Sequence, residues 1–192
     1  TSGNYARGLF LYNSDSNTTT INGNISTSGV ESIGLYLQNH NNNIITINGN
    51  ISTSGATAYG FFIDSSSGNS ITNLGTISTS GRGTYGVYMN SGTLATLNNK
   101  QSGLTYYGKV PTNYNIIIRG DADYGQTTFT SVSSTMTFGI DLTNSGTGIG
   151  DKTYQDVFTG IAASGVLTAT SGTSSGAAWS LAHDGTNWDL TI

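Results

Sequence analysis

The pentapeptide ISTSG at residues 25–29 returns at residues 51–55 and again at 77–81, each time 26 positions further along the chain. The same offset links a row of four glycines, namely Gly8, Gly34, Gly60 and Gly86. Self-similarity at a fixed period of about 20–50 residues is the sequence signature of a repeat architecture, in which each unit stacks on the next. The period therefore predicts a stack of equivalent units over the first half of the chain.

Each unit contains a segment with the alternation of a β-strand. Two always-apolar columns lie two positions apart, the first being Leu9, Leu35, Phe61 and Val87 and the second being Leu11, Leu37, Ile63 and Met89. A spacing of two is the side-chain period of a strand, so both columns are predicted to face a core. The aromatic column between them is predicted to face the opposite way and consists of Phe10, Tyr36, Phe62 and Tyr88.

Two further columns predict two more strands in each unit, one through Thr19, Ile45, Ile71 and Leu97 and the other through Ile25, Ile51 and Ile77. The polar segments between them, such as the Asn-Gly pair at 22–23, are typical of turns. Short strands repeated without insertions predict an all-β, right-handed parallel β-helix, with one 26-residue repeat per rung and rungs about 4.8 Å apart. An antiparallel sandwich also has many short strands, but it does not require identical residues at an invariant spacing.

The repeat decays after residue 97, and less regular rungs are expected to follow. Their predicted strands cover residues 104–107, 114–118, 127–132, 136–142, 154–158 and 165–169. Residues 177–192 are predicted to form a closing hairpin, with Trp179 and Trp188 packed on the last layer. We therefore divide the chain into regular rungs at 1–103 and an irregular, capping segment at 104–192. Because residues 1–3 repeat the sequence of 27–29, the chain begins within a unit, and we expect further rungs upstream in a parent protein.

The composition argues against several classes of function. The 192 residues contain six Lys and Arg against ten Asp and Glu, which gives no electrostatic footprint for nucleic acid. No apolar run approaches the length of a membrane-spanning helix. The chain has no cysteine, so disulfides, cysteine metal sites and thiol catalysis are ruled out.

No constellation of catalytic or metal-binding residues stands out in the sequence. Asp121 and Asp123 are the only close acidic pair, and they lack the pattern of a calcium loop, so we interpret them as a solvated turn. His40 and His183 both lie in turn-forming sequence and are interpreted as turn residues. The tripeptide at 119–121 spells Arg-Gly-Asp, which occurs by chance in many chains. We predict no catalytic, cofactor-binding or metal-binding residue.

The aromatic column formed by Phe10, Tyr36, Phe62 and Tyr88 is the best candidate surface feature. It has two compatible interpretations. The first is a stacked ladder that supports the sheet, and the second is an exposed stripe that binds sugars or another protein.

Several phrases of the sequence resemble a known family. They are YGVYM at 85–89, ITNLGTI at 71–77, PTNYNIII at 111–118, YGQ at 124–126 and WDL at 188–190. Together they are similar to the degenerate repeats and the C-terminal passenger region of bacterial autotransporters. That resemblance implies a secreted β-helix, carried to the cell surface by a C-terminal outer-membrane barrel that this chain does not include. The family contains adhesins, proteases, esterases and toxins, so the resemblance does not specify an activity.

We therefore expect a non-enzymatic, structural and adhesive β-solenoid at the bacterial cell surface, without a cofactor. Expected partners are surface glycans or proteins, or other copies of the chain joined end to end, but not nucleic acid, and membrane contact is expected only through the barrel. One alternative is a self-assembling extracellular filament or surface-layer subunit. A second alternative is a polysaccharide-degrading β-helix enzyme, which would bring two or more acids together in a groove.

Overall fold

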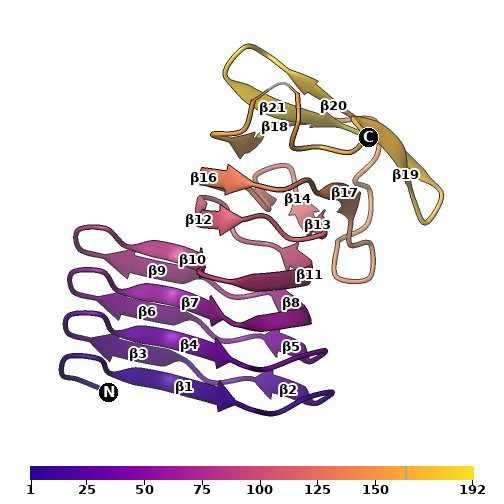
Figure 1. Ribbon diagram of the computed structural model, residues 1–192. Coiled ribbons are helices and arrows are strands. Elements are labelled where there is room, and N and C mark those ends of the chain that lie inside the picture. Colours follow the sequence, from indigo (N-terminus) through magenta and orange to yellow (C-terminus); the bar gives the residue numbers. More distant parts are fainter. Residues whose placement is uncertain (163) are drawn as a thin grey trace.

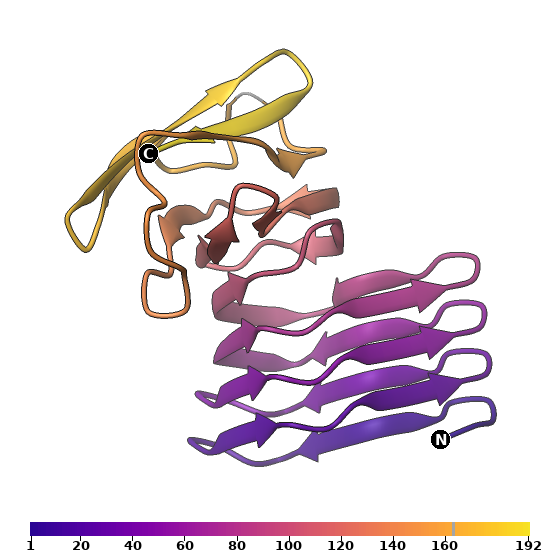
Figure 2. The ribbon, with the colours of Figure 1, turned by 180° about the vertical axis from the view of Figure 1, so that it is seen from behind.

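Equivalent segments of the repeat lie above one another in the computed structural model, which describes residues 1–162 and 164–192 (Figure 1). Three parallel sheets run up the stack. The first begins with β1 (Arg7–Tyr12), β4 (Ile33–Gln38), β7 (Tyr59–Asp64) and β10 (Tyr85–Met89), the second with β2 (Thr18–Ile21), β5 (Ile44–Ile47), β8 (Ser66–Asn73) and β11 (Gly92–Asn99), and the third consists of β3 (Ile25–Ser28), β6 (Ile51–Ser54) and β9 (Ile77–Ser80). The described residues form the predicted all-β, right-handed solenoid, with about five turns. Figure 2 shows the stack from behind.

The register of the strands confirms the period. Leu35 of β4 pairs with Leu9 of β1 and with Phe61 of β7, and Phe61 in turn pairs with Val87 of β10. Leu35, Phe61 and Val87 are fully buried, and Leu9 in the outermost rung packs against the same core while partly exposed. The predicted interior row is therefore present, and burial of such stacked apolar side chains is the main stabilising contribution.

The repeated glycines bend the first strand of each rung around this core. A Cβ atom on Gly34 would overlap the side chain of Ile51 and lie 2.8 Å from the carbonyl oxygen of Gly60. Gly34 thus faces the interior, and the next residue, Leu35, faces it as well. Two consecutive inward positions interrupt the strand alternation, as a bulge does. The residues on either side of the pair consequently both face outward.

Asparagine side chains support the turns between the first and second sheets. Oδ1 of Asn43 accepts a hydrogen bond of 2.7 Å from the backbone N–H of Asn17, one rung below. Oδ1 of Asn69 accepts bonds of 2.9 and 3.1 Å from the backbone and side chain of Asn43. Both Asn43 and Asn69 are buried. Because a buried amide destabilises the fold unless it is hydrogen-bonded, the stacking that aligns these side chains also satisfies them.

The rungs change length after β11. Gly86 donates its backbone N–H to Thr105 Oγ1 across only 19 residues, and the third sheet ends at β9. The first sheet continues through β12 (Leu104–Lys109), β16 (Thr127–Ser133) and β18 (Thr153–Thr159), the second continues through β13 (Asn113–Ile116) and β17 (Thr137–Ile140), and β14 (Ile118–Gly120) pairs with β15 (Asp123–Tyr124) as a small hairpin. The interior here is filled by larger side chains. Tyr114, for example, is fully buried, and burial raises its pKa to about 12.

The predicted closing hairpin is present. Strands β20 (Ala177–His183) and β21 (Asn187–Thr191) pair antiparallel, and β21 joins the main stack through β18. Trp179 packs edge-on against Phe138, with ring centroids 4.9 Å apart, and Trp188 is buried. The apolar hairpin thus covers the upper end of the core.

Two features of this region differ from the sequence-based prediction. The expected strand at 165–169 is wrong, because these mostly exposed residues make only a single bridge, between Leu167 and Met136. A lone bridge without a partner strand beside it does not extend into a ladder. The strand β19 (Ser171–Ser174), which was not predicted, pairs with β20 instead.

Candidate functional site

The four aromatic residues singled out in the sequence form one continuous row on the outer face of the first sheet. Ring centroids are 4.9 Å apart between Phe10 and Tyr36, 5.1 Å between Tyr36 and Phe62, and 5.4 Å between Phe62 and Tyr88. Pairs at such distances contribute about 0.5–1.5 kcal/mol each beyond the area they bury. We call this row the aromatic ladder.

Tyr107 of β12 extends the aromatic ladder by one rung. Its ring stacks almost parallel on Tyr88, with an interplanar angle of 4° and a centroid distance of 4.9 Å. Tyr107 was not predicted from the sequence, because the rung between these two residues is shorter than 26 positions. The Tyr-Tyr pair at 106–107 was the available signal, since one of the two adjacent strand residues had to face outward.

A second outward row lies beside the aromatic ladder and consists of Arg7, Ile33, Tyr59 and Tyr85. We call it the flanking row. Its members reach the outer face because each is followed by an inward pair, a glycine and then an apolar residue, which shifts the alternation. The two rows pack together, with ring centroids 4.6 Å apart between Tyr59 and Tyr88 and 4.8 Å apart between Tyr85 and Tyr107. The flanking row was also missed from the sequence, because a strict period of two does not place it on this face.

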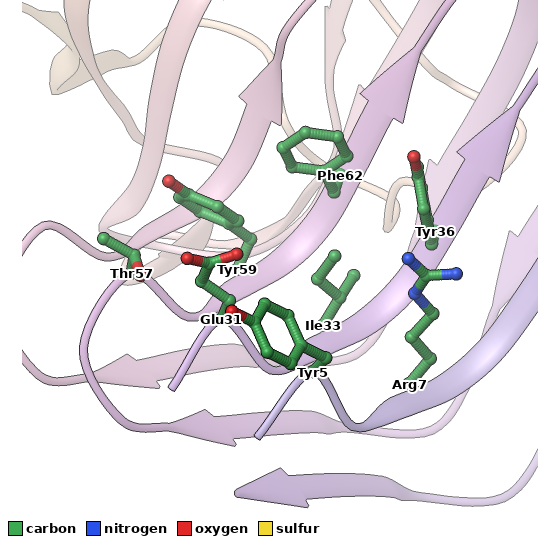
Figure 3. Close-up of a pocket in the computed structure, with 8 residues that line it drawn as sticks. All are labelled: Tyr5, Arg7, Glu31, Ile33, Tyr36, Thr57, Tyr59 and Phe62. Atoms are coloured by element: carbon green, nitrogen blue, oxygen red, sulfur yellow. The ribbon is translucent and has the colours of Figure 1, made fainter. Parts of the chain in front are cut away.

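A hollow of about 330 Å³ lies over Ile33, the one aliphatic member of the flanking row. Figure 3 shows Ile33 between Arg7 and Tyr59. The other residues that line the hollow are Tyr5, Glu31, Tyr36, Thr57 and Phe62. The hollow is therefore walled by rings on several sides and carries one cationic and one anionic side chain.

The charged groups influence the tyrosines around the hollow. The guanidinium of Arg7 lies 4.7 Å from the centroid of Phe10 and 4.5 Å from that of Tyr36, which is cation–π geometry. Burial raises the pKa of Tyr36, and Arg7 partly opposes this shift. Burial also raises the pKa of Tyr59, with Glu31 among the groups that add to it. Both phenols therefore stay protonated at neutral pH and available as hydrogen-bond donors.

The two rows cover one another to different extents along the stack. Tyr36 is only 6% exposed, because Phe10, Arg7 and Phe62 pack around it, whereas Phe10 in the outermost rung is 40% exposed. The remaining members of the aromatic ladder are half-buried. The face is thus both a packed support for the sheet and an open aromatic surface, so the structure is compatible with both interpretations drawn from the sequence.

Asp121 lies in the turn between β14 and β15 and Asp123 begins β15, and both are exposed, in agreement with the interpretation as a solvated turn. Lys152 donates a hydrogen bond to Asp121, and Lys100 lies 3.8 Å from Asp123. Within the same Arg-Gly-Asp tripeptide, Arg119 donates to the carbonyl oxygen of Asn144 at 3.2 Å. Within the residues that the structure describes, no group of three or more His, Asp or Glu side chains is arranged to hold a metal ion.

His40 lies in a turn, as interpreted from the sequence, but it is buried, unlike an ordinary turn residue. It lies in the turn between β4 and β5, but it is only 1% exposed, and neither ring nitrogen has a hydrogen-bond partner among the described residues. Burial lowers its pKa, and Asp15 partly opposes the shift. His183 is half-buried beside the terminal turn, where its ring packs edge-on against Trp188 at 5.1 Å.

In comparisons with protein-family models, with curated proteins and with solved structures, the chain has no match. The part of the chain that the structure describes contains no helix long and apolar enough to cross a membrane.

Proposed function

We propose that this chain is a structural and adhesive segment of an autotransporter-like protein at the bacterial cell surface. The stacked rungs provide a rigid scaffold, and the aromatic ladder with its flanking row provides the binding surface. The role requires no catalytic step or cofactor. The expected partners are glycans or proteins of another surface.

The observation that carries this proposal is the outward aromatic face. Half-buried rings form this face over three successive rungs, with Tyr59 and Phe62 in the first, Tyr85 and Tyr88 in the second and Tyr107 in the third. Solvent-facing aromatic residues in such a continuous group are typical of interaction surfaces. Each rung needs apolar side chains only on its inward face to form the core. The aromatic residues on the outward face are therefore explained by binding as well as by packing.

Three carboxylates of the chain accept structural hydrogen bonds. Asp64 accepts bonds of 2.9 Å from Asn90 and 2.7 Å from Ser91 in the next rung. Asp141 accepts bonds from Asn144, and Asp184 accepts from the backbone of its own turn. Carboxylates that join rungs and turns in this way favour a structural function over the alternative of a polysaccharide-degrading enzyme.

The adhesive role is tested with beads that carry the purified chain and with surfaces coated with glycans or with proteins. We expect the beads to be retained on at least one class of surface. The double variant F62S/Y88S is expected to lose retention, whereas S52A/S78A, on the exposed face of the third sheet, is expected to keep it. Retention that is equal for both variants would contradict a role for the aromatic ladder. Absence of retention on every surface would contradict adhesion.

The location is tested separately on intact cells of the source organism. We expect antibodies against the chain to label cells whose outer membrane has not been permeabilised. Labelling that appears only after permeabilisation would contradict display at the cell surface.

A further inference from the structure

We propose that the hollow over Ile33 binds one neutral hexopyranose ring of a glycan. This inference rests on the proposed adhesive function and names the chemistry of one subsite within it. The flanking row carries a ring or a guanidinium plane at Arg7, Tyr59 and Tyr85 and an aliphatic side chain only at Ile33. The row therefore lacks one ring, and the space of about 330 Å³ over Ile33 lies where that ring would be.

The size of the hollow matches a single small ring. Its volume lies at the lower end of the range of about 300–1,000 Å³ for small-molecule sites. Its walls are the rings of Tyr36, Tyr59 and Phe62. Aromatic faces carry negative charge density and attract the weakly positive C–H groups on the face of a sugar ring.

The polar groups at the hollow match hydroxyl groups. Arg7 offers only donors, Glu31 offers only acceptors, and the phenols of Tyr5 and Tyr59 offer both. Within residues 1–162 and 164–192, none of these four side chains forms a hydrogen bond or an ion pair with another protein group. Their hydrogen-bonding capacity is thus available to a ligand, and the position of Arg7 is fixed by the two rings beneath it.

The charges favour a neutral ligand. Arg7 and Glu31 contribute opposite formal charges to the same hollow, so the attraction of one of them for a charged sugar is offset by the repulsion of the other. Vicinal hydroxyls, which both donate and accept, can satisfy the two residues together. A neutral hexopyranose is therefore preferred over a uronic acid or an amino sugar.

The matched test replaces Ile33 by the residue that fills the same place one rung above. In I33Y the new ring occupies the hollow, and the column already accommodates tyrosine at positions 59 and 85. We expect I33Y to weaken binding at least about tenfold while keeping the thermal melting temperature close to that of the parent chain. The control I33L keeps an aliphatic floor and is expected to bind normally. E31Q, on an exposed side chain, is expected to weaken binding without loss of fold.

The probes are neutral methyl glucosides, galactosides and mannosides, with methyl glucuronide, glucosamine and a tyrosine-containing peptide for comparison, and saturation-transfer NMR is the readout. Saturable binding of a neutral glycoside to the parent chain and I33L, but not to I33Y, supports the inference. No binding of any neutral glycoside, or stronger binding of the uronide, the amino sugar or the peptide, overturns it. If I33Y beads are retained on surfaces as well as the parent, the subsite inference fails while the adhesive function stands.

Discussion

Gly34 shows how a single residue determines the shape of the rung. Its missing side chain lets β4 approach β6, because a Cβ would overlap Ile51 and lie 2.8 Å from the Gly60 carbonyl oxygen. We expect Gly34→Ala to lower the free energy of unfolding by about 1–3 kcal/mol through overpacking. The matched control is Gly23→Ala, where a Cβ meets no atom within 4 Å. Urea unfolding of both variants checks the prediction. Equal stability of the two would contradict it and would show that the core accommodates the extra methyl group without destabilisation.

Thr53 carries a buried hydroxyl that the fold does not use. The residue is 1% exposed, and its Oγ1 has no hydrogen-bond partner among the described residues. Burial of an unpaired hydroxyl destabilises the folded state, and valine has nearly the same shape without that group. We expect Thr53→Val to raise the free energy of unfolding by about 1 kcal/mol. Ser52→Ala, on the exposed neighbouring position, is expected to change it little, and a lower urea midpoint for Thr53→Val would contradict the prediction.

His40 makes stability depend on pH. Its pKa is lowered in the folded state by burial, from an ordinary value of 6.5, so the unfolded chain binds the proton more readily. As the pH falls below about 6.5, the unfolded state takes up more protons and the free energy of unfolding decreases, until the pH passes the folded pKa. Above about 6.5 this contribution is constant. Asp15 opposes the shift and so makes the loss smaller.

The variant His40→Ser isolates this effect, because Ser14 and Ser66 occupy the same place in adjacent rungs. Urea unfolding at pH 7.5 and at pH 5.5 is compared for both proteins, so that carboxylates, which both proteins share, cancel. We expect the parent to lose more stability than His40→Ser over this range. An equal loss of stability in the two proteins would show that His40 does not cause the pH dependence.

At the scale of the strand, the regular rungs were predictable because the sequence repeats them without insertions. The columns through Leu35 and Ile51 mark the inward face directly, and the structure confirms their burial. The flanking row was not predictable from alternation, since the bend at Gly34 and Leu35 requires knowledge of how closely two sheets approach. Tyr107 and β19 were missed because pairing after β11 no longer follows a fixed offset.

The stacked, buried side chains of Asn43 and Asn69 align β5 with its neighbours. Asn43 bonds to the rung below and to the rung above, at 2.7 and 2.9 Å. We expect Asn43→Ala to lower the free energy of unfolding by about 1–3 kcal/mol, because it removes the side-chain hydrogen bonds to Asn17 in the rung below and to Asn69 in the rung above. Asn48→Ala, which removes a bond between exposed side chains, is expected to change stability much less. Thermal unfolding of the two variants compares their losses of stability. A larger loss in Asn48→Ala than in Asn43→Ala would contradict the role of Asn43 in aligning the strands.

At the scale of the whole molecule, the solenoid behaves as a one-dimensional stack in which each rung contacts only its neighbours. Removal of one complete period should therefore leave a folded protein. Deletion of residues 56–81 joins Gly55 to Arg82 and recreates the native Gly81–Arg82 junction, since residue 55 is equivalent to residue 81. Strand β10 then lies on β4 with every inward column still inward. We expect a cooperative unfolding transition and a β-sheet circular dichroism spectrum.

The deletion also has a quantitative consequence and a matched control. Because the denaturant dependence of unfolding scales with the surface exposed, we expect the m-value to fall by about one-seventh, the share of the chain that is removed. Deletion of residues 56–68 removes half a period, so it discards β7 and the first three residues of β8 but keeps β9, and interior columns no longer align. We expect this shorter deletion to abolish the cooperative transition. If the half-period deletion folded as well as the full one, vertical register would not be what stabilises the stack.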